Sequence, residues 1–282
     1  MIYPEDYCAL IFRAPDRLRV VNAHDEVIKV ISDALENFQL DFSFYYKSEA
    51  TCAFKFKGSS PFAAAGCGQE TTIKHKRALA SILENLQKIS WHIVISTDLA
   101  KQRTNSCIFL RKIVVFDQVK IKKLTRDGKI FTFSPSGSSG ILLIDVPVDI
   151  ERELVTMVET TCKVDNYQIL DSVDSVIRTS KLTLKGWSWA ATGDNAINMR
   201  KMILKAIQIA RNHKFELVTN VNLKGTTDSL MFQHKVSLQS GAEDMFAMSL
   251  NRNDRLRLIC APSYIVTASE EVLSQHWGIQ VE

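Results

Sequence analysis

Apolar side chains recur at helical spacing in two segments of the chain that lie 124 residues apart. In the later segment they occupy positions i, i+3, i+4, i+7, i+8 and i+11, which share one face of a helix. These residues are Met199, Met202, Ile203, Ala206, Ile207 and Ala210. Subtracting 124 gives a set of which five of six are small or apolar, namely His75, Ala78, Leu79, Ile82, Leu83 and Leu86. The pattern predicts two equivalent long helices.

Alternating strands flank both predicted helices. Each helix is preceded by a strand that ends in Lys-Gly, at residues 54–58 and 182–186, and aromatic residues follow it. The offset of 124 also aligns the strand after each helix, His92–Leu99 with Glu216–Leu223. Because one offset fits both a helix and its next strand, the chain is predicted to contain an internal repeat.

A second module, a strand that runs into a turn and a helix, occurs three times. Its strands and turns are Arg17–His24, Gly140–Pro147 and Arg255–Pro262. Another strand precedes each of them, and the polar turns between the two strands suit hairpin connections. An amphipathic helix follows each copy.

The element order predicts an α+β protein of tandem β-α-β-β-β-β-α units, whose antiparallel sheets are covered on one face by helices. We divide the chain into an N-terminal ββα half unit with a joining strand (1–51), a first full unit (52–160) and a second full unit (161–282). The order resembles the topology of the TATA-binding protein, in which two such units share one curved sheet. That resemblance is one of strand order and carries no function.

The repeated motifs also resemble those of a family of poorly characterised eukaryotic proteins. They are the Lys-Gly strand with its aromatics and long helix, and the aromatic-led strand Trp91–Val94. The Asp-Arg-Leu-Arg strand occurs at Asp16–Arg19 and Asp254–Arg257, and Trp277–Gln280 provides the typical C-terminal motif. The resemblance implies no catalytic motif. The middle copy has Gly-Ile-Leu at 140–142 in place of Arg-Leu-Arg, so a role for those arginines would be missing there.

Composition indicates a soluble globular protein, since 46% of its 282 residues are hydrophobic and 23% charged. The six cysteines lack the paired spacing of a zinc site, so we expect free thiols in a reducing compartment. Residues 1–5 lack a secretory signal pattern, and no run approaches the roughly 20 apolar residues of a membrane-spanning helix. We therefore expect a cytoplasmic protein without a membrane span, with the nucleus as an alternative.

No constellation of residues points to a reaction, a metal or a cofactor. Gly66 and Gly68 lie between a strand and a helix, but the third glycine of a dinucleotide motif and the Gly-Lys-Ser/Thr of a P-loop are missing. The six histidines have no metal-ligand spacing. We name no catalytic, cofactor-binding or metal-binding residue. Whether the chain is an enzyme stays open, and the sequence favours a non-enzymatic role.

Basic residues provide the candidate contact sites for a phosphate or a partner. They cluster at the starts of the two long helices and in one alternating strand: Lys76, Arg77, Lys120, Lys122, Lys123, Arg200 and Lys201. Arginines 17, 19, 255 and 257 also alternate on matching strands. The competing interpretation is that these cations are solvated faces of half-buried elements, since the net charge is only +4.

Three hypotheses follow for function. The leading one is a non-enzymatic protein-binding or scaffold module that uses a free sheet face or edge and self-associates through its N-terminal half unit. The second is nucleic-acid binding by the basic strands and helix starts. The third is an enzyme whose site is assembled between units from residues far apart in sequence.

Overall fold

The computed structural model describes most of the chain. Its described residues are 7–13, 16–22, 24–48, 50–57, 68–97, 106–113, 128–173, 176–186, 189, 192–221, 229–236, 238, 245–251 and 255–276. Within these ranges the fold contains five helices, two six-stranded antiparallel sheets and one two-stranded sheet. The α+β class and the tandem repetition predicted from sequence are confirmed.

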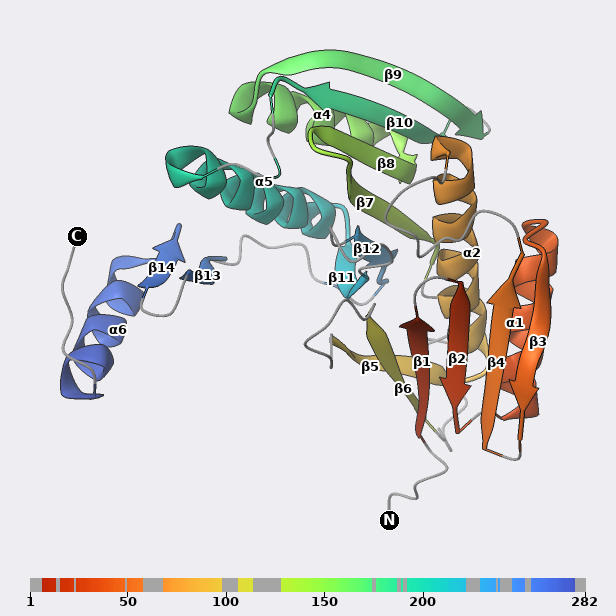
Figure 1. Cartoon of the computed structure of the whole chain (residues 1–282). Helices are drawn as coiled ribbons and strands as arrows, with labels where there is room; N and C mark the ends of the chain where they lie inside the picture. Colours follow the sequence, from red (N-terminus) through yellow and green to blue (C-terminus); the bar gives the residue numbers. More distant parts are fainter. Residues whose placement is uncertain are drawn as a thin grey trace.

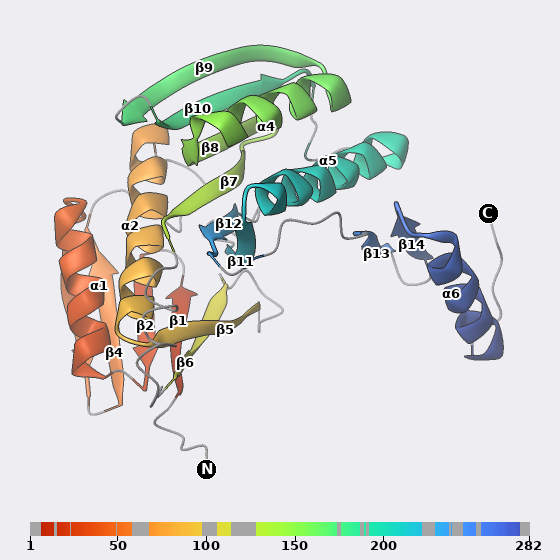
Figure 2. The ribbon, with the colours of Figure 1, turned by 180° about the vertical axis from the view of Figure 1, so that it is seen from behind.

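The first sheet contains six strands in the order β3-β4-β2-β1-β6-β5. Their bounds are β1 Tyr7–Arg13, β2 Arg17–Val21, β3 Phe42–Lys47, β4 Thr51–Phe56, β5 Trp91–Thr97 and β6 Cys107–Lys112. Helices α1 (Asp25–Asn37) and α2 (Gln69–Lys88) cover one face, which is the far side in Figure 1 and the near side in Figure 2.

The second sheet repeats this plan in the order β11-β12-β7-β8-β10-β9. Its strands are β7 Ile130–Ser136, β8 Gly140–Pro147, β9 Val164–Val173, β10 Ile177–Leu184, β11 Phe215–Val221 and β12 Ser229–His234. Helices α4 (Val148–Thr161) and α5 (Gly193–Asn212) pack on one face. A third segment comprises β13 (Ala247–Asn251), β14 (Arg255–Ile259) and α6 (Ser263–His276), and it lies beside α5 (Figures 1 and 2).

Backbone geometry confirms the repeat. The predicted offset of 124 relates α2 to α5 and β5 to β11 residue for residue. It also relates the left-handed residue Ser90 to its counterpart Lys214. The equivalent residue at the C-terminal end of the second strand is left-handed in all three ββα modules: Asn22 and Cys260 directly follow β2 and β14, and Asp145 lies within β8. Positive φ is uncommon outside glycine, so its recurrence at one position marks equivalent turns.

The strand pairing groups the chain into units with other boundaries than the predicted segments 1–51, 52–160 and 161–282. β1 and β2 occupy the middle of the first sheet, because β2 pairs with β4 and β1 pairs with β6. The N-terminal ββα segment is therefore part of a complete ββαββαββ unit. The two large sheets are also separate rather than one continuous sheet. Their edge strands β5 and β11 meet where the Ser96 hydroxyl donates to the Asn220 carbonyl oxygen at 2.5 Å.

Helix α2 belongs to both units. Its residues Leu79, Leu83 and Leu86 are buried in the first core, together with residues of α1 and the first sheet. Ile73 packs instead against the second sheet, on the face opposite α4 and α5, with Leu142 and Ile144 of β8. In Figure 1 the upper end of α2 reaches β8 and β10 while its lower part lies behind the first sheet. The second sheet thus has helices on both faces, whereas the described helices that pack on the first sheet lie on one face.

Candidate functional site

Arg77 is held in the contact between the two units. Its Nε and Nη2 donate to both carboxylate oxygens of Asp145 at 2.7–3.1 Å, and Nη2 also donates to Asp171 at 2.9 Å. Burial alone would lower the pKa of Arg77, but the hydrogen bonds and charges of the two carboxylates outweigh it and raise that pKa. The guanidinium of Arg77 is thus already engaged within the molecule.

The same surface of α2 makes further polar contacts with the second unit. The buried Lys76 ammonium donates to the Ser134 hydroxyl. The buried side chains of Gln87 and Gln233 donate to each other, with N–O distances of 2.9 and 2.6 Å. The Ile130 N–H donates to Glu84 at 2.6 Å. The basic start of α2 is therefore part of an internal interface.

The other predicted contact residues do not join Lys76 and Arg77. Lys120, Lys122 and Lys123 lie outside the described residues. Arg200 and Lys201 lie on α5, across the second sheet from α2, where Arg200 donates to the Ala196 carbonyl and Lys201 is exposed. A partner-binding role for these side chains stays a prediction.

The face of the first sheet opposite α1 and α2, which we call the outer face, carries several basic side chains and is covered by none of the described helices. Side chains alternate along each strand, and one set lies in the core. The alternate set on the four central strands points outward: Tyr7, Ala9, Ile11, Arg13, Arg17, Arg19, Val21, Thr51, Ala53, Lys55, Cys107, Phe109 and Arg111. The face turns toward the viewer in Figure 1.

Three cations stand side by side across the outer face. Arg17 is directly opposite Arg13 on β1 and Lys55 on β4. Side chains in such pairs have Cβ atoms roughly 5 Å apart, and like charges so placed are destabilising. None of the outward positions on the four central strands carries an acidic residue. In the described part of the chain, Asp16 is the acidic group nearest in sequence, with its Oδ1 at 3.7 Å from Arg17 Nε. An anionic ligand would relieve this repulsion.

Aromatic rings accompany the arginines of the outer face. The Arg17 guanidinium carbon lies 4.0 Å from the centroid of Tyr45 on β3, and that of Arg111 lies 5.9 Å from the centroid of Tyr7. In such cation–π contacts the negative face of the ring attracts the guanidinium group. Tyr45 is itself 55% exposed. The rings and guanidinium groups together give the outer face both apolar and cationic groups.

The middle copy of the repeat shows what happens where this face is covered. Gly140 and Leu142 occupy the positions of Arg17 and Arg19, and Leu142 is fully buried against Ile73 of α2. Arginine there would be buried beneath the helix, at a high desolvation cost. Arginines thus occupy these positions on the outer face of the first sheet, and glycine and leucine occupy them where α2 covers the equivalent face of the second sheet.

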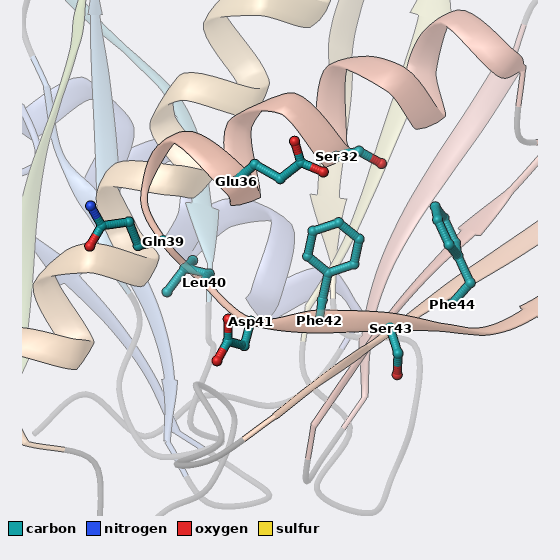
Figure 3. Close-up of a pocket in the computed structure, with 8 residues that line it drawn as sticks. All are labelled: Ser32, Glu36, Gln39, Leu40, Asp41, Phe42, Ser43 and Phe44. Carbon is teal, nitrogen blue, oxygen red and sulfur yellow. The ribbon is translucent and has the colours of Figure 1, made fainter.

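A surface pocket lies away from the outer face, between the end of α1 and the start of β3. Figure 3 shows Ser32 and Glu36 reaching it from the helix and Phe42 and Phe44 from the strand. Its remaining lining residues are Gln39, Leu40, Asp41 and Ser43. The lining thus offers hydroxyls and carboxylates but no histidine, lysine or cysteine to complete a nucleophile–base pair. The enzyme hypothesis gains no support from this pocket.

The described residues contain no cluster of three or more His, Cys, Asp or Glu side chains arranged to hold a metal ion. Within the same residues, no helix combines the length and apolar character needed to cross a membrane.

Comparison with known proteins identifies the family through its repeats. One family of uncharacterised domains matches residues 6–111, 129–233 and 244–282. The chain belongs to this family. The first two matches coincide closely with the two six-stranded units, and the third with the β13–β14–α6 segment. No curated protein matches the chain. The family thus supports the repeated architecture and provides no activity.

Part of the outer face is predictable from the sequence, and the rest is not. The alternating arginines 17 and 19 were visible because both lie on one short strand. Arg13, Lys55 and Arg111 each occur once in their strands, so no local pattern connects them. Only the strand order β4-β2-β1-β6 brings these side chains together. A set assembled from four strands leaves no signal in a single window of sequence.

Proposed function

We propose that the chain is a non-enzymatic protein-binding module, and that the outer face of its first sheet binds an acidic amphipathic helix of a partner protein. The observation that supports this proposal is the packing of α2 on the second sheet. In the second unit, α2 lies on the sheet face opposite α4 and α5, which is equivalent to the outer face of the first sheet. The outer face of the first sheet is the equivalent surface, and it is uncovered by any described helix.

Charge indicates which kind of helix the first sheet would accept. In the internal example the helix contributes the cation Arg77 and the sheet contributes Asp145 and Asp171. On the first sheet the signs are reversed, because the sheet itself carries Arg17, Arg19 and the other outer-face cations. Electrostatic complementarity therefore favours a partner helix with acidic residues.

A synthetic peptide provides the test. It has the sequence of residues 69–88 with Lys74→Glu, Lys76→Glu and Arg77→Glu, and a fluorescent label for anisotropy measurements with the 282-residue chain. We expect the acidic peptide to bind and the unmodified basic peptide not to bind. Arg17→Glu with Arg19→Glu should weaken binding at least roughly tenfold, equivalent to about 1.4 kcal/mol.

A matched variant controls for net charge. Lys201→Glu with Lys205→Glu makes the same change in charge on exposed positions of α5, and it should leave the peptide affinity unchanged. Far-UV circular dichroism verifies that both double variants are folded. Loss of binding in the α5 variant alone would move the binding surface to α5, and binding of neither peptide would contradict the proposal.

Nucleic-acid binding is a second candidate, favoured by the exposed Tyr45 ring stacked with Arg17. Proteins that bind single strands combine a positively charged track with aromatic side chains on which bases stack. A labelled single-stranded oligonucleotide should then bind with an affinity that falls steeply with salt, since several phosphates would be contacted. Oligonucleotide binding that depends on Arg17 and Arg19, without peptide binding, would favour this candidate over the first.

Thiol chemistry supports a cytoplasmic or nuclear setting for either candidate. Burial raises the pKa of Cys8 to about 12, so this thiol stays protonated and unreactive at neutral pH. The five described cysteines are free, which is the ordinary state in a reducing compartment. Fractionation of cells that express the tagged chain would test the location.

A further inference from the structure

The segment β13–β14–α6 is built like the first half of each complete unit. Its left-handed residue Cys260 corresponds to Asn22 and Asp145. The antiparallel pair β13–β14 matches β1–β2, with Met248 opposite Leu258 as Leu10 is opposite Val20. The segment therefore has the geometry of a ββα half unit.

Positions that form the core elsewhere are exposed in this segment. Met248 and Leu250 are 59% and 82% exposed, whereas Leu10 and Phe12 at the equivalent positions of β1 are 0% and 3% exposed. On the helix, Val272 is 54% exposed, and its counterpart Ala34 on α1 is buried. No described residue of α6 is buried. An apolar face of this kind on the surface marks an interaction site.

The complete units show what covers the equivalent face. There a second ββα half joins the first: β4 pairs antiparallel with β2, and α2 packs beside α1. The second sheet does the same with β10, β8, α5 and α4. Among the described strands, β14 has β13 as its one neighbour, and no described strand pairs with its other edge. The occupant that fits is another ββα half.

We propose that a second copy of this chain provides that half, so that two β13–β14–α6 segments join through antiparallel pairing of their β14 strands. In the complete units the two ββα halves meet through their second strands, which run antiparallel, as strands related by a local two-fold axis do. Identical halves can therefore meet in the same way, which gives a closed two-fold dimer. The product is a four-stranded sheet with both α6 helices on one face, and Leu256 and Leu258 of both copies lie between sheet and helices.

This interface is separate from the outer face of the first sheet. It uses the opposite end of the chain, and the proposed partner is another copy rather than an acidic helix. Failure of one proposal therefore leaves the other intact.

Sedimentation equilibrium of the full chain tests the proposal. We expect a species of twice the 31.8 kDa chain mass at high micromolar concentration, dissociating on dilution. Val272→Glu should abolish the dimer, because it places a charge in the apolar contact. The matched control is Val176→Glu, at a position 62% exposed in the hairpin between β9 and β10, and it should leave the dimer unchanged.

Hydrogen exchange identifies the strand that forms the proposed dimer contact. Amides of β14 should exchange more slowly as protein concentration rises, while those of the exposed edge strand β9 should not change. A monomer at all concentrations would overturn the proposal. So would a dimer that persists in Val272→Glu, or an assembly that grows beyond two chains, since one half unit per chain closes at the dimer.

Discussion

Two carboxylates illustrate how single residues respond to their surroundings in this fold. Burial alone would raise the pKa of Glu26, but hydrogen bonds from Lys112 at 2.6 Å and from Trp91 Nε1 at 2.9 Å outweigh it, and the pKa is lowered. Burial raises the pKa of Glu84, and the Ile130 N–H offsets this only in part. The two side chains therefore contribute to stability with opposite dependence on pH.

For Glu26 the folded state favours the charged form. Its stabilising contribution is present above the unfolded-state pKa and is lost as pH falls through the lowered folded-state pKa. Glu26→Gln should therefore lower the urea midpoint at neutral pH, and the difference from wild type should shrink as pH falls below the ordinary carboxyl pKa. A difference that is constant with pH would show that charge is not the cause.

For Glu84 the folded state favours the protonated form. Its ionisation costs stability as pH rises from the unfolded-state pKa through the raised folded-state pKa. Glu84→Gln keeps an oxygen that accepts the Ile130 N–H and removes the buried charge, so it should raise the urea midpoint at neutral pH. The gain should shrink toward acid pH. An unchanged or lower midpoint at neutral pH would contradict this interpretation.

Among the elements, helix α2 is the one that packs against both large sheets. Arg77 makes most of its charged hydrogen bonds with the second unit. Arg77→Ala removes charged hydrogen bonds to Asp145 and Asp171, which should cost on the order of 2 kcal/mol in urea denaturation. The matched control is Lys201→Ala, at the equivalent position of α5, where the side chain is exposed. That change should cost less than about 0.5 kcal/mol. Equal effects of the two changes would contradict the role of α2.

The elements themselves were accessible from sequence, whereas local irregularities were not. Alternation predicts that Phe42, Phe44 and Tyr46 share one face of a strand. In the structure, a register shift between Phe44 and Tyr46 places Tyr46 opposite Ala53, so it lies on the outer face. Phe42 and Phe44 keep their ring contacts with Phe54. A bulge inserts one residue and reverses the alternation beyond it, and the pattern of apolar residues does not reveal where.

At the scale of the whole molecule, the sequence revealed the repeat but not its phase. A chain built of ββα modules followed by ββ pairs can be divided into units at several points with equal regularity. The unit boundaries depend on which strands pair, and β1 pairs with β6, which lies about 100 residues later in the sequence. Likewise, nothing in the helix pattern distinguishes α2, which contacts two sheets, from α5. Long-range pairing therefore set both the unit boundaries and the composition of the outer face.

The sharing of α2 predicts that the two large sheets unfold together. Leu154 of α4 is 1% exposed in the second core, among residues of the second unit alone. Leu154→Ala should destabilise by about 2–5 kcal/mol, the usual cost of a buried cavity. If α2 couples the units, native-state hydrogen exchange should show the same loss of opening free energy for amides of β1 as for amides of β8. A loss confined to β8 would mean that the units open independently and that the contacts of Arg77, Gln87 and Ile73 do not join them into one cooperative structure.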